Sequence, residues 1–584
     1  MKYSDQIADW LIQLDYTHCF YVGGGNIMHL IESLSKKLTC VPVINEVAAG
    51  IAAEYFNETS IGTKALAMVT AGPGLTNIVT ALAGAYLESR ELLVIGGQVK
   101  TADLARGVLR QRGIQEIDGV SIVQPITVKS VLVDEPISFD AFKSIVLHDG
   151  VYRPGPVFIE IPIDVQARLV EFTTPKTNNL GAELPKISLG DIAGVVNKIN
   201  HAKRPAILLG GGINRRTAKH LKDKLSQLSI PILTTWNAAD RIPFDQHNYM
   251  GRPNTWGQRS ANLVMQQADL LIAVGTRLGM QQTGFNWQNF IPNGHVIQID
   301  IDKAELEKGH PKIDLGLFGD ANTFLEDLLD KKIDDHSEWL TYARSIRNAI
   351  PLVEDVNKTA SGFLSPYHFA QMLSSVCSET DVVIPCSSGG AFTIMMQTFE
   401  QKGDQKIVTN KGLASMGYGL SGAIGAAIAN PNSRTVLVEG DGGFSQNLQE
   451  IGTAAINELN LKMFIFDDSG YASIRATQRN YFGGSYVGCD RSTGLGLPNW
   501  EKLFAAWDVP VMRLNKDFTE DVKFRAMFES DGLAAFIVPV DPEQTYFPKI
   551  TSRITENGSM ESNPLHKMTP DLSEEQYLNV SKYL

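Results

Sequence analysis

Cysteine is scarce in this chain: the 584 residues include only five, and no two of them form a CxxC pair. An odd, scattered set argues against a disulfide framework or a cysteine zinc site and is typical of a reducing compartment. No run of about 18 apolar residues is present, so we expect no membrane span. The first residues, MKYSDQIADWLIQL, place Asp5 and Asp9 among apolar positions, which predicts an amphipathic helix and not a signal peptide. We therefore expect a cytoplasmic protein.

Acidic residues outnumber basic residues in this chain. The chain has 52 Lys and Arg against 64 Asp and Glu, a formal net charge of −12. This balance argues against non-specific nucleic-acid binding, which needs clustered positive charge, so we expect no nucleic-acid partner. An apolar content of 43% and a charged content of 20% are ordinary for a globular protein. A chain of this length is too long to fold around one hydrophobic core, so we expect about three or four domains.

The pattern along the chain indicates three α/β domains and a tail. We expect domains over 1–172, 186–332 and 360–545, and a tail over 546–584 that is either a lid over the site or disordered. The turn-rich stretch 173–185 is typical of a linker. Strand-like runs include 156–162, 206–209, 270–274 and 296–301. The Gly210-Gly211-Gly212 turn lacks the full G-x-G-x-x-G spacing, which favours a tight βα turn over a dinucleotide site.

Residues 436–471 are the most informative segment. An apolar strand-like run from Val436 to Val438 leads into the turn Gly440-Asp441-Gly442-Gly443. A helical pattern follows, and a second apolar run at 463–466 ends in Asp467-Asp468-Ser469-Gly470. The predicted order is strand, glycine-rich turn, helix, strand and acidic turn.

The geometry of such a unit suggests its chemistry. In a right-handed βαβ unit both strands point the same way, so Asp441 and Asp468 should lie side by side. The free N–H groups at the start of the helix face the same crevice and attract an anion. Two carboxylates attract Mg²⁺ or Ca²⁺. A GDG turn alone is more often a surface turn, but the second acidic turn favours a site for a metal bridged to a diphosphate.

This segment resembles the thiamin-diphosphate motif, which begins with GDG and closes with an Asn-Asn pair. Other segments are similar, in the right order, to the acetolactate synthase and pyruvate oxidase superfamily, and the resemblance covers nearly the whole chain. They are FYVGGG at 20–25, NEVAAG at 45–50, VTAGPGLTN at 69–77, GIQE at 113–116 and NKGLASMGYG at 410–419. The stretches GVLRQRGIQEIDGVSIVQPITVKS and YASIRATQRNYFGG look most like thiamin-dependent synthases of bacterial surface-polysaccharide biosynthesis.

The resemblance implies three doubly wound parallel-sheet domains: pyrimidine-binding, central and diphosphate-binding. It also implies a homodimer or homotetramer with each site between two chains, Glu46 coming from one and Asp441 from the other. Asp441, Asp468 and the carbonyl of Gly470 match the metal ligands. Near the reacting carbon lie the counterparts of Glu46, Gln115, Gly24 and Gly25. Further cofactor contacts match Pro73, Asn77, Gly390, Ala391, Met416, Gly440, Gly442, Gly443 and Tyr471.

In the family, a glutamate hydrogen-bonds the aminopyrimidine ring of the cofactor and drives it toward its imino form. Glu46 matches that position. Taken alone, a glutamate near the start of an alanine-rich helix is usually solvated or capping. The small and apolar residues that follow Glu46, from Val47 to Ala52, instead predict that it points into a packed interface, where it could share a proton.

Two positions depart from the family. The family usually has His where this chain has Asn45, and a neutral amide cannot titrate near neutral pH. The family usually has Asn at the second metal position, where this chain has Asp468, preceded by Asp467. The extra negative charge predicts tighter dependence on Mg²⁺, or an effect of pH on cofactor binding.

Two further features leave alternatives open. Arg475 and Arg479 share a helix face, which is either solvated or binds an anionic acceptor such as a nucleotide-sugar phosphate. FAD is a further cofactor that the resemblance allows, since some relatives hold it in the central domain. The alternative is a central domain of the same fold that binds no FAD. The segments that partly match the FAD pattern are Gly251-Arg252, Gly257, Ala261-Asn262, Gly275-Thr276-Arg277 and Gly284.

The resemblance implies a thiamin-diphosphate- and Mg²⁺-dependent carboligase, a lyase or transferase of the acetolactate-synthase type. It would decarboxylate a 2-keto acid such as pyruvate and transfer the acyl unit to a carbonyl acceptor, for which a nucleotide keto-sugar is one candidate. The first alternative is acetolactate synthesis from two pyruvates. The second is a catalytically silent homologue acting as a binding subunit, supported only by Asn45 and the Asp467-Asp468 pair. A dehydrogenase is disfavoured because no complete dinucleotide fingerprint exists.

Overall fold

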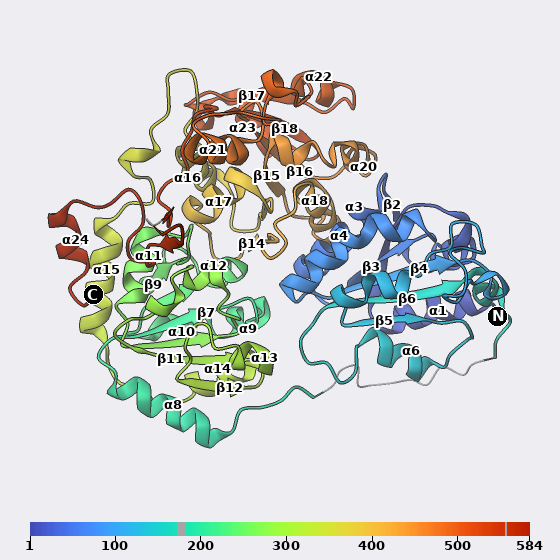
Figure 1. The fold of residues 1–584 in the computed structure, drawn as a ribbon, viewed down its shortest axis with the longest axis horizontal. Helices are drawn as coiled ribbons and strands as arrows, with labels where there is room; N and C mark the ends of the chain where they lie inside the picture. Colours follow the sequence, from blue (N-terminus) through green and yellow to red (C-terminus); the bar gives the residue numbers. More distant parts are fainter. Residues whose placement is uncertain (172–182, 555–556) are drawn as a thin grey trace.

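The computed structural model describes residues 1–171, 183–554 and 557–584. Within these residues it contains three six-stranded sheets, each with helices on both faces (Figure 1). Neighbouring strands in all three sheets run parallel. The predicted fold class is therefore confirmed. Most of the predicted linker, at 173–182, lies outside the described residues, and the predicted domain boundaries stay predictions.

The N-terminal sheet has the strand order β2-β1-β3-β4-β6-β5. The predicted amphipathic helix at the N-terminus is confirmed as α1. The strands are β1 (Tyr16–Tyr21), β2 (Thr39–Pro42), β3 (Lys64–Val69), β4 (Leu92–Gln98), β5 (Lys129–Leu132) and β6 (Pro156–Pro162). The helices are α1 (Tyr3–Gln13), α2 (Met28–Leu34), α3 (Glu46–Thr59), α4 (Pro73–Glu88), α5 (Gly119–Val123), α6 (Phe139–Val146) and α7 (Ile163–Ala167).

The central sheet has the order β12-β11-β10-β7-β8-β9. Three of its strands, β7, β10 and β11, confirm the predicted runs at 206–209, 270–274 and 296–301. The strands are β7 (Pro205–Leu209), β8 (Ile232–Thr234), β9 (Tyr249–Gly251), β10 (Leu270–Val274), β11 (His295–Asp300) and β12 (Leu315–Phe318). The helices are α8 (Leu189–His201), α9 (Arg215–His220), α10 (Lys222–Gln227), α11 (Arg259–Gln266), α12 (Met280–Thr283), α13 (Lys303–Glu307), α14 (Ala321–Leu329) and α15 (Ser337–Ala349).

The C-terminal sheet has the order β14-β13-β15-β16-β18-β17, which repeats the topology of the N-terminal sheet strand for strand. The strands are β13 (Val382–Pro385), β14 (Lys406–Ile407), β15 (Thr435–Gly440), β16 (Leu461–Asp467), β17 (Val511–Arg513) and β18 (Ala534–Pro539). The helices are α16 (Pro366–Val376), α17 (Gly389–Thr398), α18 (Tyr418–Ala429), α19 (Asp441–Phe444), α20 (Ile451–Ile456), α21 (Ala472–Tyr481), α22 (Trp500–Ala505) and α23 (Val522–Glu529).

The helix predicted after the GDGG turn differs in detail from the prediction. It begins at Asp441, within the motif, and is split into α19 and α20 by an irregular stretch and a short 3₁₀ turn. The split follows Ser445 and Asn447, residue types whose side chains compete for backbone hydrogen bonds. Here the Asn447 amide donates to the carbonyl of Gly417, 2.7 Å away.

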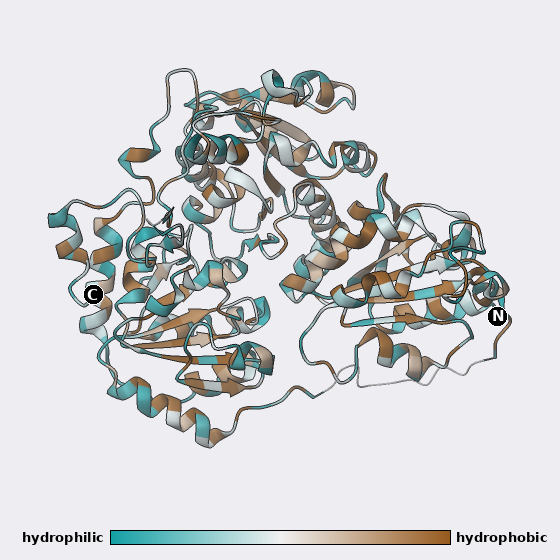
Figure 2. Ribbon diagram, in the orientation of Figure 1, coloured by the Kyte–Doolittle hydropathy of each residue, from teal (hydrophilic) through white to brown (hydrophobic). Residues whose placement is uncertain are grey.

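The N- and C-terminal domains share one hydrophobic core. Figure 2 shows the interior strands as largely apolar, which is typical of parallel sheets covered on both faces. Helix α18 is almost entirely buried because it lies between its own sheet and α3. The approach is close: a Cβ on Gly425 would lie 2.0 Å from the carbonyl oxygen of Ala52.

The described part of the tail packs on the central domain. It contains β19 (Ser552–Ile554), β20 (Met560–Ser562) and α24 (Glu574–Val580), which lies beside α15 in Figure 1. Leu565, Met568 and Val580 join the apolar cluster under α11 and α15. The lid role stays a prediction. Among the described residues, no helix is long and apolar enough to cross a membrane.

Candidate functional site

The two acidic turns lie side by side at the carboxyl edge of the C-terminal sheet. Strands β15 and β16 are neighbours in parallel register, with Gly440 opposite Phe466, so Asp441 and Asp468 leave the sheet together. Both side chains are buried. Asp441 accepts the N–H of Gly442 through Oδ1 at 2.7 Å and the N–H of Gly470 through Oδ2 at 3.1 Å. The structure thus brings together three residues of the predicted metal site.

Electrostatics at this edge favour a bound cation. Burial, with a contribution from Asp467, raises the pKa of Asp441 to about 7. Burial and then the Asp441 carboxylate raise the pKa of Asp468 well above its ordinary value. The Asp468 Oδ1 atom is buried and has no hydrogen-bond partner among the described residues. Two crowded carboxylates with an unpartnered oxygen suit Mg²⁺, so the residues present fit the metal that the resemblance implies.

A metal here needs oxygen ligands beyond these two side chains. In the part of the chain that the structure describes, no group of three or more His, Cys, Asp or Glu residues could hold a metal ion. This agrees with a donor set of two carboxylates and one backbone carbonyl, completed by oxygens of a bound diphosphate.

Glycines and the Met416 segment border the same edge. A Cβ on Gly442 would fall 2.3 Å from the ring of Tyr471, and one on Gly390 would fall 2.2 Å from the ring of Tyr546. Gly390 and Ala391 lie in the first turn of α17. The Ser387 hydroxyl, just before that helix, donates to the carbonyl of Ser415 beside Met416. Met416 is 38% exposed, as a residue that contacts a ligand must be before the ligand binds.

Glu46 lies at the start of α3 and is bound by a second predicted residue. Asn45 caps the helix, with its side-chain oxygen accepting the N–H of Val47 at 3.1 Å. Glu46 is 9% exposed, and Asn77 on α4 donates to its Oε2 atom at 2.9 Å. Pro73 occupies the first turn of α4, where a missing N–H costs nothing. Glu46, Asn77 and Pro73 therefore meet at the carboxyl edge of the N-terminal sheet.

The remaining predicted residues of this domain lie on loops at the same edge. Gly24, in the loop before Gly25, approaches Thr70 so closely that a Cβ would lie 2.4 Å from that side chain. Gln115 is exposed, and its carbonyl oxygen would lie 2.5 Å from a Cβ on Gly72, whose φ of +66° favours glycine. These close contacts explain the glycines at positions 24 and 72.

Two glutamates at these loops were not singled out from the sequence as site residues. Glu116 accepts N–H groups of Ala105, Arg112 and Gly113. Burial raises the pKa of Glu116, but these hydrogen bonds outweigh burial and lower it. Glu450, from the C-terminal domain, accepts the N–H of Asn45 at 3.0 Å. A carboxylate that orders a distant loop leaves no local pattern, so only the fold identifies it.

The contacts of Glu46 and of the Met416 segment lie at different points along α4. Gly412 and Tyr418 contact the C-terminal half of α4, at Glu88 and Gly84 respectively. Glu46 is bonded to Asn77, near the start of α4. Seven residues separate Asn77 from Gly84, which is about 10 Å along a helix. The expected partnership of Glu46 with Asp441 across two chains agrees with this separation and stays a prediction.

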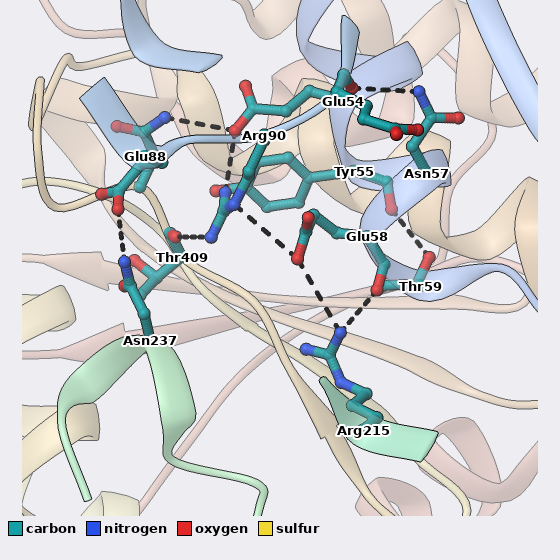
Figure 3. Close-up of polar contacts among 12 residues, drawn as sticks. Glu54, Tyr55, Asn57, Glu58, Thr59, Glu88, Arg90, Arg215, Asn237 and Thr409 are labelled. Atoms are coloured by element: carbon teal, nitrogen blue, oxygen red, sulfur yellow. Dashed lines mark hydrogen bonds and ion pairs between the residues drawn. The ribbon is translucent and has the colours of Figure 1, made fainter. Parts of the chain in front are cut away.

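A buried polar network joins α3 to the segment that precedes Met416 (Figure 3). Glu54, fully buried on α3, accepts hydrogen bonds from Arg90 at 2.8 Å, Tyr418 at 3.1 Å and Asn410 at 3.2 Å. Arg90 also donates to the carbonyl of Thr409 at 2.7 Å. Burial raises the pKa of Glu54 to about 7, although Arg90 lowers it. The network fixes α3, which begins at Glu46, against the segment that leads to Met416.

The two candidate substrate arginines are differently placed. Arg475 is 3% exposed and donates to the carbonyls of Asp468, Ser469 and Pro542 at 3.1–3.4 Å, so its guanidinium supports the acidic turn. Arg479 is more exposed and pairs with Glu543. A substrate role for either stays a prediction, and Arg479 is the more accessible of the two.

Residues of the partial FAD pattern are engaged within the protein. Arg252 is buried and donates to the carbonyls of Met396 and Phe399 and to the Gln401 side chain, all within 2.7 Å. The N–H of Gly212 donates to the carbonyl of Gly275 at 2.9 Å, which bridges the two glycine turns at the switch point of the central sheet. FAD stays untested.

Family models and individual relatives both match this chain over most of its length. Three family models match: "Thiamine pyrophosphate enzyme, N-terminal TPP binding domain" over 1–122, "central domain" over 192–328 and "C-terminal TPP binding domain" over 388–538. The chain is 29% identical over 538 residues to acetolactate synthase isozyme 1 large subunit of Escherichia coli, covering 91% of this chain and 92% of that protein. It is 30% identical over 545 residues to a probable acetolactate synthase large subunit of Methanocaldococcus jannaschii, covering 90% and 89%.

Proposed function

The chain belongs to the thiamine pyrophosphate enzyme family, and from this we propose a thiamin-diphosphate- and Mg²⁺-dependent carboligase. It decarboxylates a 2-keto acid, with pyruvate as the first candidate, and transfers the acyl unit to a carbonyl acceptor. The observation that carries the proposal is the buried pair Asp441 and Asp468, with the unpartnered Oδ1 of Asp468, beside the first turn of α19.

Each residue has a defined task in this proposal. Asp441, Asp468 and the Gly470 carbonyl would hold Mg²⁺, and the first turn of α19 would face the diphosphate. Bound thiamin diphosphate supplies carbanion chemistry toward a 2-keto acid. Glu46 would hold or release a proton at Oε1, because Asn77 donates to Oε2.

The proposed enzyme works as a homodimer or homotetramer. The 10 Å offset along α4 between the Glu46 contact and the Met416 segment supports a site shared between chains. One chain then contributes Glu46, Gln115 and the Gly24 loop, and the other contributes Met416 and the metal pair. Within each chain, the interdomain network around Glu54 fixes α3, which carries Glu46, relative to the Met416 segment.

The acceptor is the open part of the proposal. The resemblance of 107–130 and 471–484 to synthases of surface-polysaccharide biosynthesis supports a nucleotide keto-sugar. The names of the relatives support the alternative, acetolactate synthesis from two pyruvates. The loop 105–116, which contains Gln115 and is held together by hydrogen bonds to Glu116, would decide between the two acceptors, since loops set specificity on a shared fold.

Product analysis tests the proposal. The purified protein is incubated with pyruvate, thiamin diphosphate and Mg²⁺, with and without a nucleotide keto-sugar, and the products are identified by mass spectrometry. A branched sugar that depends on Glu46 supports the proposal, and acetolactate formed without the sugar supports the alternative. A protein that binds the cofactor but consumes neither pyruvate nor other 2-keto acids is the silent homologue. The absorbance of the same preparation near 450 nm decides whether FAD is bound.

A further inference from the structure

Two cysteines far apart in sequence are direct neighbours in the N-terminal sheet. Strands β1 and β2 pair in parallel, and Cys19 lies opposite Cys40 in the register. Register partners point to the same face of a sheet. Both thiols accordingly pack in the apolar cluster beneath α1 and α2. The other three cysteines of the chain lie in the C-terminal domain.

The two thiols have unequal environments. Cys19 is fully buried, whereas Cys40 is partly exposed at the edge strand. A hydrogen bond from the Cys19 thiol lowers the pKa of Cys40. The same hydrogen bond, and then burial, raise the pKa of Cys19. Cys40 is thus suited to react first with an oxidant, and Cys19 is suited to displace the oxidant's remaining half from Cys40.

We propose that Cys19 and Cys40 form a reversible disulfide that switches the enzyme off under oxidising conditions. Neighbouring strands lie about 4.8 Å apart. This spacing falls within the range of about 4.4–6.8 Å between the Cα atoms of natural disulfides, so the bond forms without a change in the register of β1 and β2.

The oxidant in this reaction is a low-molecular-weight disulfide such as glutathione disulfide. The Cys40 thiolate attacks one sulfur of that disulfide, forms a mixed disulfide and releases one thiolate. The Cys19 sulfur then attacks the Cys40 sulfur and releases the second thiolate. The two protein thiols lose two electrons in total, the oxidant is reduced to two thiols, and these take up the two protons.

The position of the pair couples it to catalysis, a step that rests on the proposed function. Strand β1 leads directly into the loop with Gly24, and β2 leads into Asn45 and Glu46. Unbonded heavy atoms lie about 3.5–4.0 Å apart and bonded sulfurs about 2.05 Å apart, so oxidation draws the two sulfurs together by about 1.5–2 Å. Since a shift of about 1 Å at a catalytic group can cost about 100-fold in rate, we expect a loss of about 10- to 100-fold.

Peptide mapping tests the bond itself, independently of activity. The full-length protein is equilibrated in glutathione buffers of increasing oxidation, alkylated and digested without reduction. We expect a peptide pair linked through Cys19 and Cys40 that disappears on reduction and is missing in Cys40→Ser. The matched control Cys377→Ser, which changes a buried cysteine of the C-terminal domain, should retain it. Free Cys40, or Cys40 bound only to glutathione across the series, would overturn the proposal.

The rate of CO₂ release tests the switch. Oxidation should slow the wild-type protein and Cys377→Ser about 10-fold or more, and dithiothreitol should restore both. Cys40→Ser and Cys19→Ala should be insensitive to the buffer. A linked peptide without any loss of rate would refute the switch. A reduced protein with no CO₂ release would instead refute the proposed function and leave peptide mapping to decide the disulfide.

Discussion

Replacing Asp468 with asparagine should stabilise the metal-free protein. Asp441 and Asp468 are buried together, and after burial itself the Asp441 carboxylate is the largest cause that raises the pKa of Asp468. The rise in the pKa of Asp441 from 3.8 to about 7, caused first by burial and then by Asp467, corresponds to about 4 kcal/mol and shows how unfavourable negative charge is at this edge. The change Asp468→Asn removes the carboxylate repulsion but keeps a side chain of similar shape. We expect a gain on the order of 2 kcal/mol near pH 8, or about 4 °C in the thermal midpoint.

The pH dependence has a defined sign. Because the folded state raises the pKa of Asp441, its contribution to stability is fully present below about pH 4 and is lost as the pH rises through about 7. The metal-free wild-type protein should therefore be more stable near pH 6 than near pH 8. This difference should shrink in Asp468→Asn.

Scanning fluorimetry of the protein in a chelator, and again with Mg²⁺ and thiamin diphosphate, measures both effects. Mg²⁺ should raise the midpoint of the wild-type protein more than that of Asp468→Asn, because the variant lacks the charge that the metal neutralises. The comparison variant is Asp467→Asn, which removes a charge that raises the pKa of Asp441 but also breaks the ion pair with Arg513 at 2.9 Å, so its gain should be smaller than that of Asp468→Asn. A metal-free Asp468→Asn protein that melts below the wild type would refute the reasoning.

Three further changes probe the rest of the account. Glu54→Gln removes the nearer of the two carboxylates that pair with buried Arg90, the other being Glu58 at 3.8 Å, and should cost about 3 kcal/mol in unfolding free energy by urea titration; no loss would contradict a charged pair. Gly24→Ala places a methyl 2.4 Å from Thr70 and should reduce the rate of CO₂ release about 100-fold while leaving the far-ultraviolet circular dichroism unchanged; an active variant would remove this loop from the site. Glu46→Gln and Asp441→Asn chains should each be inactive alone but recover about a quarter of the wild-type activity when co-expressed; no recovery would contradict a site shared between chains.

Local patterns predicted the strand ends of the C-terminal site well. The βαβ rule alone placed Asp441 beside Asp468, because parallel neighbouring strands must end at one edge. The flanking apolar residues of Glu46 likewise predicted its burial. Both conclusions depend on contacts between elements that are close in the chain.

Long-range contacts could not be read from the sequence. The Cys19–Cys40 register depends on which strands pair, and the scattered cysteines alone suggested only a reducing compartment. Glu54 accepts a hydrogen bond from Tyr418, which lies more than three hundred residues away in the sequence, so no local spacing predicts this contact. The polar helix α21 gave no sign that Arg475 is buried, because its buried face packs on the acidic turn and not on an apolar core. Periodicity detects apolar faces only.

The most direct test of the central claim is CO₂ release from pyruvate by the purified protein with thiamin diphosphate and Mg²⁺, compared with Glu46→Gln. The account predicts release by the wild-type protein and a loss of at least about 100-fold in the variant, which retains the hydrogen bond to Asn77 but cannot exchange the proton. Equal release by both proteins would contradict the role of Glu46. No cofactor binding by the wild-type protein would contradict the proposed enzyme altogether.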